Sequence, residues 1–394
     1  MTIAGQHSAA CVDVQTAPVW RAGFRPFYLL GPLFGVTALS LWAAGRWDGA
    51  GVLHGMPVWH AHEMLFGFAG ALAGGFVLTA VPSWTGTPAV TGRPLAVLAS
   101  VWLLGRLAVL LGTEWPAAAL ADLFYVPVLA WLAAPGVWRA RNPLYRLLLA
   151  ILAGLFAGNL LFHGGIAMDD PALAALGVHV ALYGFMVLYS FVAGLLTPIF
   201  TETALRARGD SWTAIFSMPL EWAAALTVLA VAIADLGGLG VSAVAVAAGA
   251  AAVVHALRMA RWRPLAVRDD PVMWPMHLGY AFFVLAFALL AFDAPASAAV
   301  HAFTVGAMGL TKLSLMTRVV LKHTGRPVRA TRWTQAVYAA MLLAVAARLP
   351  AAWGVAPEGM LAMAAALWAL SMGGFVALYG GMLVAPSLPY DRRG

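Results

Sequence analysis

Long apolar stretches, separated by short polar segments rich in proline, glycine and charge, follow one another along this chain of 394 residues. A helix that crosses a bilayer needs roughly 20 predominantly apolar residues, and about twelve stretches reach that length. The pattern therefore predicts an all-α, polytopic integral membrane protein. We expect a polar cytoplasmic N-terminal tail at 1–23, followed by a single transmembrane helical domain at 24–394. The expected spans are 24–45, 59–82, 94–113, 115–138, 144–166, 171–200, 218–237, 239–260, 274–293, 296–322, 333–353 and 357–386.

The composition supports the membrane class. Only 10% of the residues are charged and 62% are hydrophobic, whereas soluble domains carry about 25% charged residues. The net charge of +7 comes from loop residues. It therefore reflects membrane topology, and a nucleic-acid partner is not expected. The chain has one cysteine, Cys11, which excludes an internal disulfide and an iron–sulfur cluster.

The connections between the expected spans alternate between basic and acidic or neutral. Since cytoplasmic loops are the basic ones, both termini should be cytoplasmic and the odd-to-even loops should face the outside, which is the periplasm if the membrane is the inner membrane of a Gram-negative bacterium. The basic segments carry Arg21 and Arg25, Arg139 and Arg141, Arg258 to Arg268, Lys322 to Arg332, and Arg392 and Arg393. The opposite connections carry Glu114, Asp169, Asp170, Asp235 and Asp293.

Six of the ten histidines fall near the expected outer face. At a rise of 1.5 Å per residue they lie within roughly 15 Å of that surface. Ionisable side chains inside hydrocarbon are rare and mark functional sites, so a buried haem or metal centre is predicted on this side. The six are His54, His60, His62, His163, His179 and His301.

The densest segment runs from Trp59 to Gly67 and holds His60, His62 and Glu63. Residues two apart on a helix point about 200° apart, so the two imidazoles should address two neighbouring centres, or one centre and a supporting partner. Glu63 lies three residues after His60, where a carboxylate can accept the second N–H of a ligating imidazole. The alternative is an interfacial cluster that anchors the helix at the headgroups.

The other candidate residues are spread over later spans. His179 and Tyr183 are four apart on one helical face, where the phenol can supply a proton or an electron, although Tyr183 also suits ordinary packing. His301 opens the tenth span and is expected to be a ligand. His163 suits a ligand and a hydrogen-bonded core residue equally well, and His54 suits a solvated loop.

Three of the charged residues that lie inside the expected spans each have two possible roles. Lys312 lies in the inner half of the tenth span, where it could carry protons or extend its ammonium group to the inner surface. Arg106 and Asp122 both lie toward the outer side. They are expected to pair with each other or with a charged cofactor edge, and the sequence does not choose between these arrangements.

Spans two, six and ten each carry a histidine followed by a glycine five residues later. Glycine permits the close approach of a helix or a flat macrocycle. The equal interval of four helices suggests a threefold pseudo-repeat of four-helix units. The pairs are His62 and Gly67, His179 and Gly184, and His301 and Gly306.

Imidazole ligands suit copper, zinc and iron, and haem iron takes axial histidine. The chain has no Cys-x-x-Cys-His motif, so any haem would be held non-covalently.

Seven segments of the chain match a known family: Phe24–Phe27, Trp59–Met64, Val81–Gly86, Asn159–His163, His301–Gly306, Met316–Arg318 and His323–Arg326. On these segments the chain resembles the NnrS family of bacterial membrane proteins. The resemblance implies about twelve helices, haem and copper as cofactors, and a role in denitrification and in the response to nitrosative stress by nitric oxide.

A more distant resemblance concerns architecture. Haem–copper oxidases and nitric oxide reductases also have twelve helices, with ligands toward the outer face on helices two, six, seven and ten. His62, His179 with Tyr183, and His301 are similar to that scheme. The seventh span has no histidine, so the usual pair of copper ligands is missing, and His163 or His54 would have to replace them.

The sequence thus favours a haem- and copper-binding protein of nitric oxide metabolism, a candidate oxidoreductase that reduces or scavenges nitric oxide. His60, His62, His179 and His301 are the expected ligands, with Glu63 and Tyr183 beside them. Nitric oxide, membrane lipid and an electron donor are the expected partners. Two alternatives stay open: a secondary transporter, and a haem or copper carrier without redox turnover.

Overall fold

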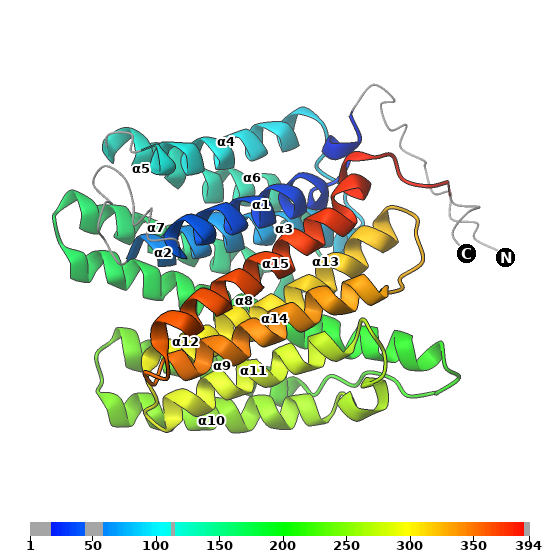
Figure 1. Ribbon diagram of the computed structural model, residues 1–394. Coiled ribbons are helices and arrows are strands. Elements are labelled where there is room, and N and C mark those ends of the chain that lie inside the picture. Colours follow the sequence, from blue (N-terminus) through cyan, green and yellow to red (C-terminus); the bar gives the residue numbers. More distant parts are fainter. Residues whose placement is uncertain (1–16, 44–57, 112–114, 390–394) are drawn as a thin grey trace.

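The computed structural model describes residues 17–43, 58–111 and 115–389. Within these ranges there is no strand, and twelve helices are long and apolar enough to cross a membrane. They run side by side as one elongated bundle (Figure 1). The predicted all-α class with twelve spans is therefore confirmed.

The span boundaries agree closely with the apolar pattern. The largest difference is in the sixth span, which continues to Arg206. The first part of the chain forms η1 (Pro18–Trp20), α1 (Phe24–Ala43), α2 (Val58–His62), η3 (Glu63–Ala69), α3 (Gly70–Thr85), α4 (Arg93–Leu110), α5 (Trp115–Leu123), α6 (Tyr125–Trp138), η4 (Pro143–Arg146) and α7 (Leu147–Ala167). The second part forms α8 (Pro171–Arg206), α9 (Met218–Leu236), α10 (Val241–Ala260), η5 (Pro264–Val267), α11 (Trp274–Ala291), α12 (Ala296–His301), η6 (Ala302–Gly309), α13 (Leu310–His323), α14 (Arg332–Ala351) and α15 (Pro357–Val384).

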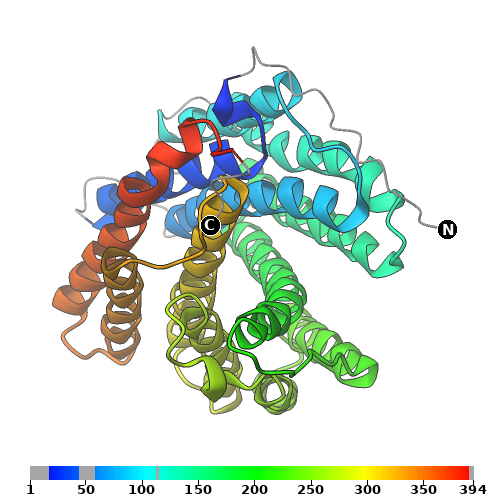
Figure 2. The ribbon, with the colours of Figure 1, turned by 90° about the vertical axis from the view of Figure 1, so that its right-hand side faces the viewer.

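Three spans form the centre of the bundle. In an 18-residue window of the second, sixth and tenth spans, 89%, 72% and 72% of the residues are buried. The next most buried span reaches 50%. In the end-on view, α13 of the tenth span lies in the middle of the bundle (Figure 2). These are the three spans that carry the histidine–glycine pairs, and the threefold pseudo-repeat stays a prediction.

Two of the central spans contain π-helical turns directly after their histidines. Segment η3 follows His62, and η6 follows His301. Each turn holds a glycine where another ring comes close. A Cβ on Gly67 would lie 2.5 Å from the Phe34 ring, and one on Gly306 would lie 2.6 Å from the Phe282 ring. Single π-turns inside α-helices are frequent at functional sites.

The first and last spans are joined at one end of the bundle by Arg25. Its guanidinium donates to the carbonyls of Leu383 and Ala385 at 2.9 and 2.7 Å, and to the Ser387 hydroxyl at 2.9 Å. Both described chain ends lie on this side (Figure 1). Arg25 thus holds the first and last spans together, in addition to the effect of its charge on membrane orientation.

Helices α7 and α8 form a tight antiparallel hairpin because glycines face each other across it. A Cβ on Gly158 would lie 2.8 Å from the Gly177 carbonyl oxygen and 3.0 Å from the Ala181 nitrogen. These neighbours are backbone atoms, which cannot move independently of their helix. The hairpin therefore depends on the absence of a side chain at this position.

We expect Gly158→Ala to lower the free energy of unfolding by about 1–3 kcal/mol, since overpacking would push the two helices apart. Gly154→Ala is the matched control on the same helix, because no atom lies within 4 Å of the added Cβ and alanine favours helix. Thermal unfolding of the two purified variants in detergent measures the difference. Equal melting temperatures would contradict the tight packing of this hairpin.

Candidate functional site

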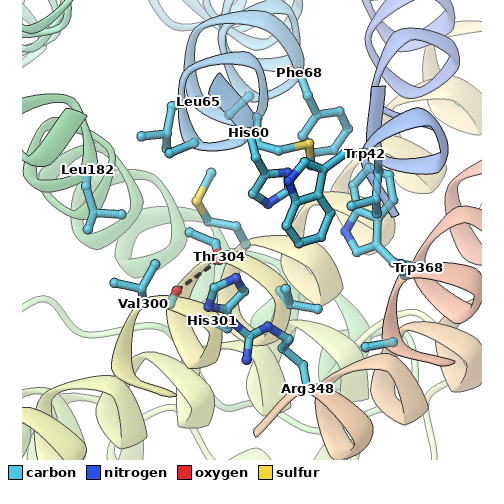
Figure 3. Close-up of a pocket in the computed structure, with 18 of the residues that line it drawn as sticks. Trp42, His60, Leu65, Phe68, Leu182, Val300, His301, Thr304, Arg348 and Trp368 are labelled. Carbon is cyan, nitrogen blue, oxygen red and sulfur yellow. Dashed lines mark hydrogen bonds between the residues drawn. The ribbon is translucent and has the colours of Figure 1, made fainter. Parts of the chain in front are cut away.

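A cavity of about 340 Å³ opens at the end of the bundle opposite the chain termini. His60 of α2, His179 of α8 and His301 of α12 line it, together with Arg348 of α14. His60, His301 and Arg348 point into the same space (Figure 3). Cofactor and ligand pockets commonly measure roughly 300–1,000 Å³, so the cavity reaches the size of a binding site.

The orientation of His301 is fixed by its own helix. Its Nδ1–H donates to the Ser297 carbonyl oxygen at 2.7 Å, so the lone pair of the imidazole is on Nε2. A hydrogen bond of this kind is what orients histidines that bind metals. Arg348 donates to the hydroxyl of the same serine at 2.6 Å. Ser297 therefore holds both the imidazole and the guanidinium beside the cavity.

His60 is held by an aromatic neighbour. Its ring stacks on Trp42 of α1 with centroids 4.3 Å apart and an interplanar angle of 22°. His179 lines the same cavity from α8 with an exposed side chain. The structure thus brings together three of the predicted ligands from three central spans.

The rest of the wall is apolar. Within the described parts of the chain, its ionisable groups are the three imidazoles and the guanidinium, with no carboxylate. Such a wall suits a largely apolar ligand with an anionic edge. The apolar lining includes Trp42, Leu65, Phe68, Leu182, Met308 and Trp368.

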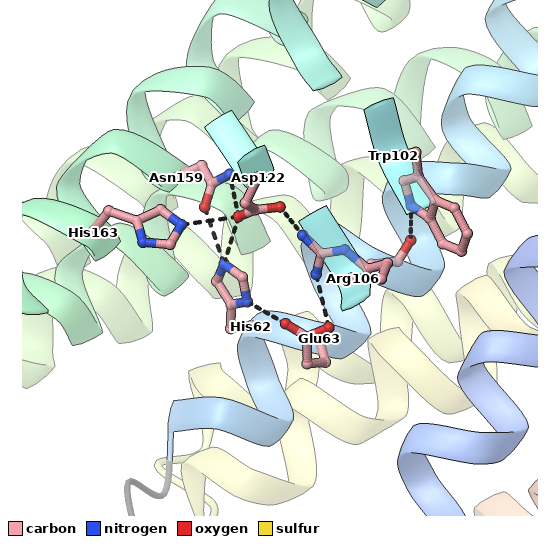
Figure 4. A network of polar contacts seen from close by, with 8 residues as sticks. His62, Glu63, Trp102, Arg106, Asp122, Asn159 and His163 are labelled. Carbon is pink, nitrogen blue, oxygen red and sulfur yellow. Dashed lines mark hydrogen bonds and ion pairs between the residues drawn. The ribbon is translucent and has the colours of Figure 1, made fainter. Parts of the chain in front are cut away.

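His62 and Glu63 point away from this cavity into a separate buried polar cluster (Figure 4). Every member is at most 3% exposed, so their charges must be compensated within the protein. The cluster joins residues of α2, η3, α4, α5 and α7. Its members are His62, Glu63, Arg106, Asp122, Asn159 and His163.

Arg106 is the cationic centre of the cluster. Its guanidinium donates to Glu63 Oε2 at 2.8 Å and forms an ion pair with Asp122. A second contact joins the same two spans, since the Trp102 indole N–H donates to the Gly67 carbonyl oxygen at 3.1 Å. Of the two arrangements left open by the sequence, the structure shows Arg106 paired with Asp122.

The His62 ring lies between the two carboxylates. Nδ1 is 2.7 Å from Glu63 Oε1, and Nε2 is 3.1 Å from both Asn159 Oδ1 and Asp122 Oδ2. Phe162 stacks on the ring, with centroids 4.1 Å apart. The imidazole is therefore fixed in position and in rotation.

His163 completes a group that is compatible with metal binding. Its Nε2 lies 2.9 Å from Asp122 Oδ2. One ligand atom each from His62, Asp122 and His163 lie within 4.8 Å of one another, and all three residues are buried. Imidazole and carboxylate donors suit copper, zinc and iron. Asp122 is not among the ligands that the sequence predicts, although it lies toward the outer side of span four.

The opposite directions of His60 and His62 agree with the helical spacing. The position of Glu63 differs from the expectation, because its carboxylate bonds His62 and not His60. The backbone widens into a π-turn at Glu63, and Arg106 attracts the carboxylate into the buried cluster. Glu63 therefore supports His62.

Two further predicted residues lie elsewhere. The Tyr183 hydroxyl donates to Asp235 Oδ2 of α9 at 2.9 Å, and Tyr183 does not border the cavity. His54 lies outside the described residues. Sequence reasoning missed Arg348, although an arginine inside the apolar eleventh span is itself a signal of a functional position.

The chain matches a known protein family. A family model described as NnrS protein matches residues 18–387. No curated protein matches the chain. Because the match covers nearly the whole sequence, the chain belongs to the NnrS family, and this membership supports a membrane protein of the nitric oxide response.

Proposed function

We propose that this protein holds haem in the pocket of His60, His179 and His301, holds copper at the buried cluster of His62, Asp122 and His163, and reduces nitric oxide. The observation that carries the proposal is the His301 ring, whose Nδ1–H is bound to a carbonyl while its Nε2 is available beside two further imidazoles. Family membership supports the link to nitric oxide.

The residues of the pocket fit haem. His301 would bind the iron, with His60 beside it, and the rings of Phe68 and Trp368 would contact the macrocycle. Arg348 would pair with its carboxylates, which explains a guanidinium in an otherwise apolar wall. Haem would be held non-covalently, by packing and by these contacts.

The buried cluster fits copper. Its two imidazoles and one carboxylate already converge, and Arg106 and Asn159 hold the carboxylate from the other side. Outer groups of this kind orient metal ligands and raise affinity by about 10–100-fold. The two centres would be neighbours, because His60 and His62 are two residues apart.

The reaction joins two nitric oxide molecules with two electrons and two protons to give nitrous oxide and water. When bound, haem iron supplies a binding site for nitric oxide and transfers electrons from an external one-electron donor, such as a reduced cytochrome. The apolar wall favours a small neutral ligand over water, Ser297 keeps His301 oriented, and Arg348 keeps positive charge at the rim.

We also propose the orientation in the bacterial inner membrane. The pocket lies at the end opposite the termini, and the basic connections are on the side of the termini. By the positive-inside rule the termini are cytoplasmic and the pocket faces the periplasm.

Purified protein is expected to be coloured, to contain both haem and copper, and to change its visible spectrum when nitric oxide is added. Elemental analysis and a titration with nitric oxide under anaerobic conditions measure this. His323→Ala is the control, because His323 is exposed at the other end of the bundle. A colourless protein free of metal would contradict the proposal.

A further inference from the structure

A second, smaller cavity lies deeper in the bundle, between α3, α8 and α13, and contains Lys312. The cavity measures about 60 Å³. Among the described residues, the Lys312 ammonium has no hydrogen-bond partner, and it is buried. It lies 5.6 Å from the centroid of the Phe68 ring and 5.5 Å from that of Phe185. An unpaired cation is costly at this depth, so Lys312 requires a functional explanation.

The cavity has the size and the polar groups to hold water. A buried water needs at least about 10–15 Å³ and two to four polar partners, so there is room for a few molecules. Lys312, Thr311 and Tyr189 all line the cavity. The Tyr189 and Thr311 hydroxyls are hydrogen-bonded to each other at 2.7 Å. Water here would give the ammonium the partners that it otherwise lacks.

This cavity adjoins the histidine pocket. Met308 lines both cavities, and Phe68, which lies beside the Lys312 ammonium, also lines the pocket. Met308 is unbranched and has three rotatable bonds. Its side chain therefore forms part of the wall between the two spaces.

Polar groups continue from the cavity toward the end of the bundle that carries the termini. The Tyr189 ring stacks on the Tyr280 ring, with centroids 6.1 Å apart. The Tyr280 hydroxyl lies 2.7 Å from His255 Nδ1 and accepts from Arg258 at 3.1 Å. Arg258 forms an ion pair with Glu221, whose side chain is 22% exposed in the first turn of α9. Polar contacts thus lead from a partly exposed carboxylate as far as Tyr280, whose ring contacts that of Tyr189 in the cavity wall.

We propose that Lys312 and water in its cavity carry protons from the side of the termini to the histidine pocket. This inference rests on the proposed function, because nitric oxide reduction consumes protons at the pocket. The ammonium gives its proton to nitric oxide being reduced in the pocket, and the resulting amine takes a proton from cavity water beside Tyr189 and Thr311. That water is reprotonated in turn from the side of the termini, where Glu221 is partly exposed. The net transfer is one proton per cycle, with Lys312 restored.

The water is tested by hydroxyl-radical footprinting of the purified full-length protein, read by mass spectrometry. Met316 lines the cavity, and Met372 does not, while both are at most 1% exposed. We expect Met316 to be oxidised several-fold faster than Met372, because radicals form from water in the cavity. Equal rates at the two methionines would overturn the inference.

Proton transfer is tested with Lys312→Met, which removes the charge and keeps the length of the side chain. The rate of proton uptake on chemical reduction, followed with a pH-indicator dye, should fall by about a hundred-fold. Haem and copper content should be unchanged. Lys322→Met is the matched control on the same helix, because Lys322 is exposed, and Lys312→Arg should retain part of the rate. Wild-type uptake rates in Lys312→Met would overturn the inference.

The two proposals can fail separately. A protein that takes up protons through Lys312 but does not consume nitric oxide would refute the proposed function alone. A protein that reduces nitric oxide at the same rate with and without Lys312 would refute the proton route alone. If the purified protein has no redox centre, the proposed function fails, and the Met316 footprint still decides whether the cavity holds water.

Discussion

His301→Ala is expected to lose haem and keep copper, whereas His163→Ala is expected to lose copper and keep haem. The two residues belong to different sites, one in the wall of the large cavity and one in the buried cluster. Removing a ligand should cost more than the roughly 10–100-fold in affinity that removing an outer group costs. Each variant should therefore be purified almost free of one cofactor.

Visible spectra and elemental analysis of the two variants measure this difference. His323→Ala is again the control, since it replaces an exposed histidine remote from both sites. Loss of both cofactors in either variant would indicate a single shared centre. Retention of both in His301→Ala and His163→Ala would remove these two residues from the ligand sets.

Arg106→Ala is expected to destabilise the protein by about 3–5 kcal/mol, because it leaves two buried carboxylates without their cation. Glu63 and Asp122 would both lose an ion pair at positions with almost no solvent exposure. Thermal unfolding in detergent measures the effect. Arg93→Ala on the same helix is the control, since Arg93 is exposed and its loss should change little.

A triple variant separates the loss of charge balance from the loss of the arginine itself. Replacing Arg106 by leucine, Glu63 by glutamine and Asp122 by asparagine removes all three charges, and the two side-chain amides keep hydrogen-bonding groups beside His62, His163 and Asn159. The triple variant leaves no buried charge uncompensated, whereas Arg106→Ala leaves two, so the triple variant should melt above Arg106→Ala. A triple variant that is less stable than Arg106→Ala would mean that charge balance is not what this cluster provides.

The fold could be predicted from the sequence because a transmembrane helix is specified locally. Backbone groups in hydrocarbon must be satisfied within the segment, and a run of apolar residues identifies that segment without knowledge of its neighbours. The depth of a residue then follows from counting. The sequence therefore predicts His60, His179 and His301 near the outer face, and all three line one cavity.

The lateral arrangement could not be predicted in the same way. Which side chains meet depends on how each helix is rotated and on which helices are neighbours. Glu63 was expected beside His60 and lies beside His62, since the regular helical spacing ends at that residue. Arg348 joins the pocket only because α14 packs against η6 and α12, and span eleven itself does not reveal that contact.

The π-turns have a consequence for the length of the two spans in which they occur. Each contains one residue more than a regular α-helix would need, and each residue turns an α-helix by about 100°. Deleting one residue between positions 63 and 69 would let span two close into a continuous α-helix. His60 and His62 would then swing by that angle relative to α3, and neither would meet its present neighbours. In these two spans the number of residues sets the directions of the imidazoles as much as the identity of the residues does. A homologue that lacks the extra residue would therefore have its imidazoles in different directions.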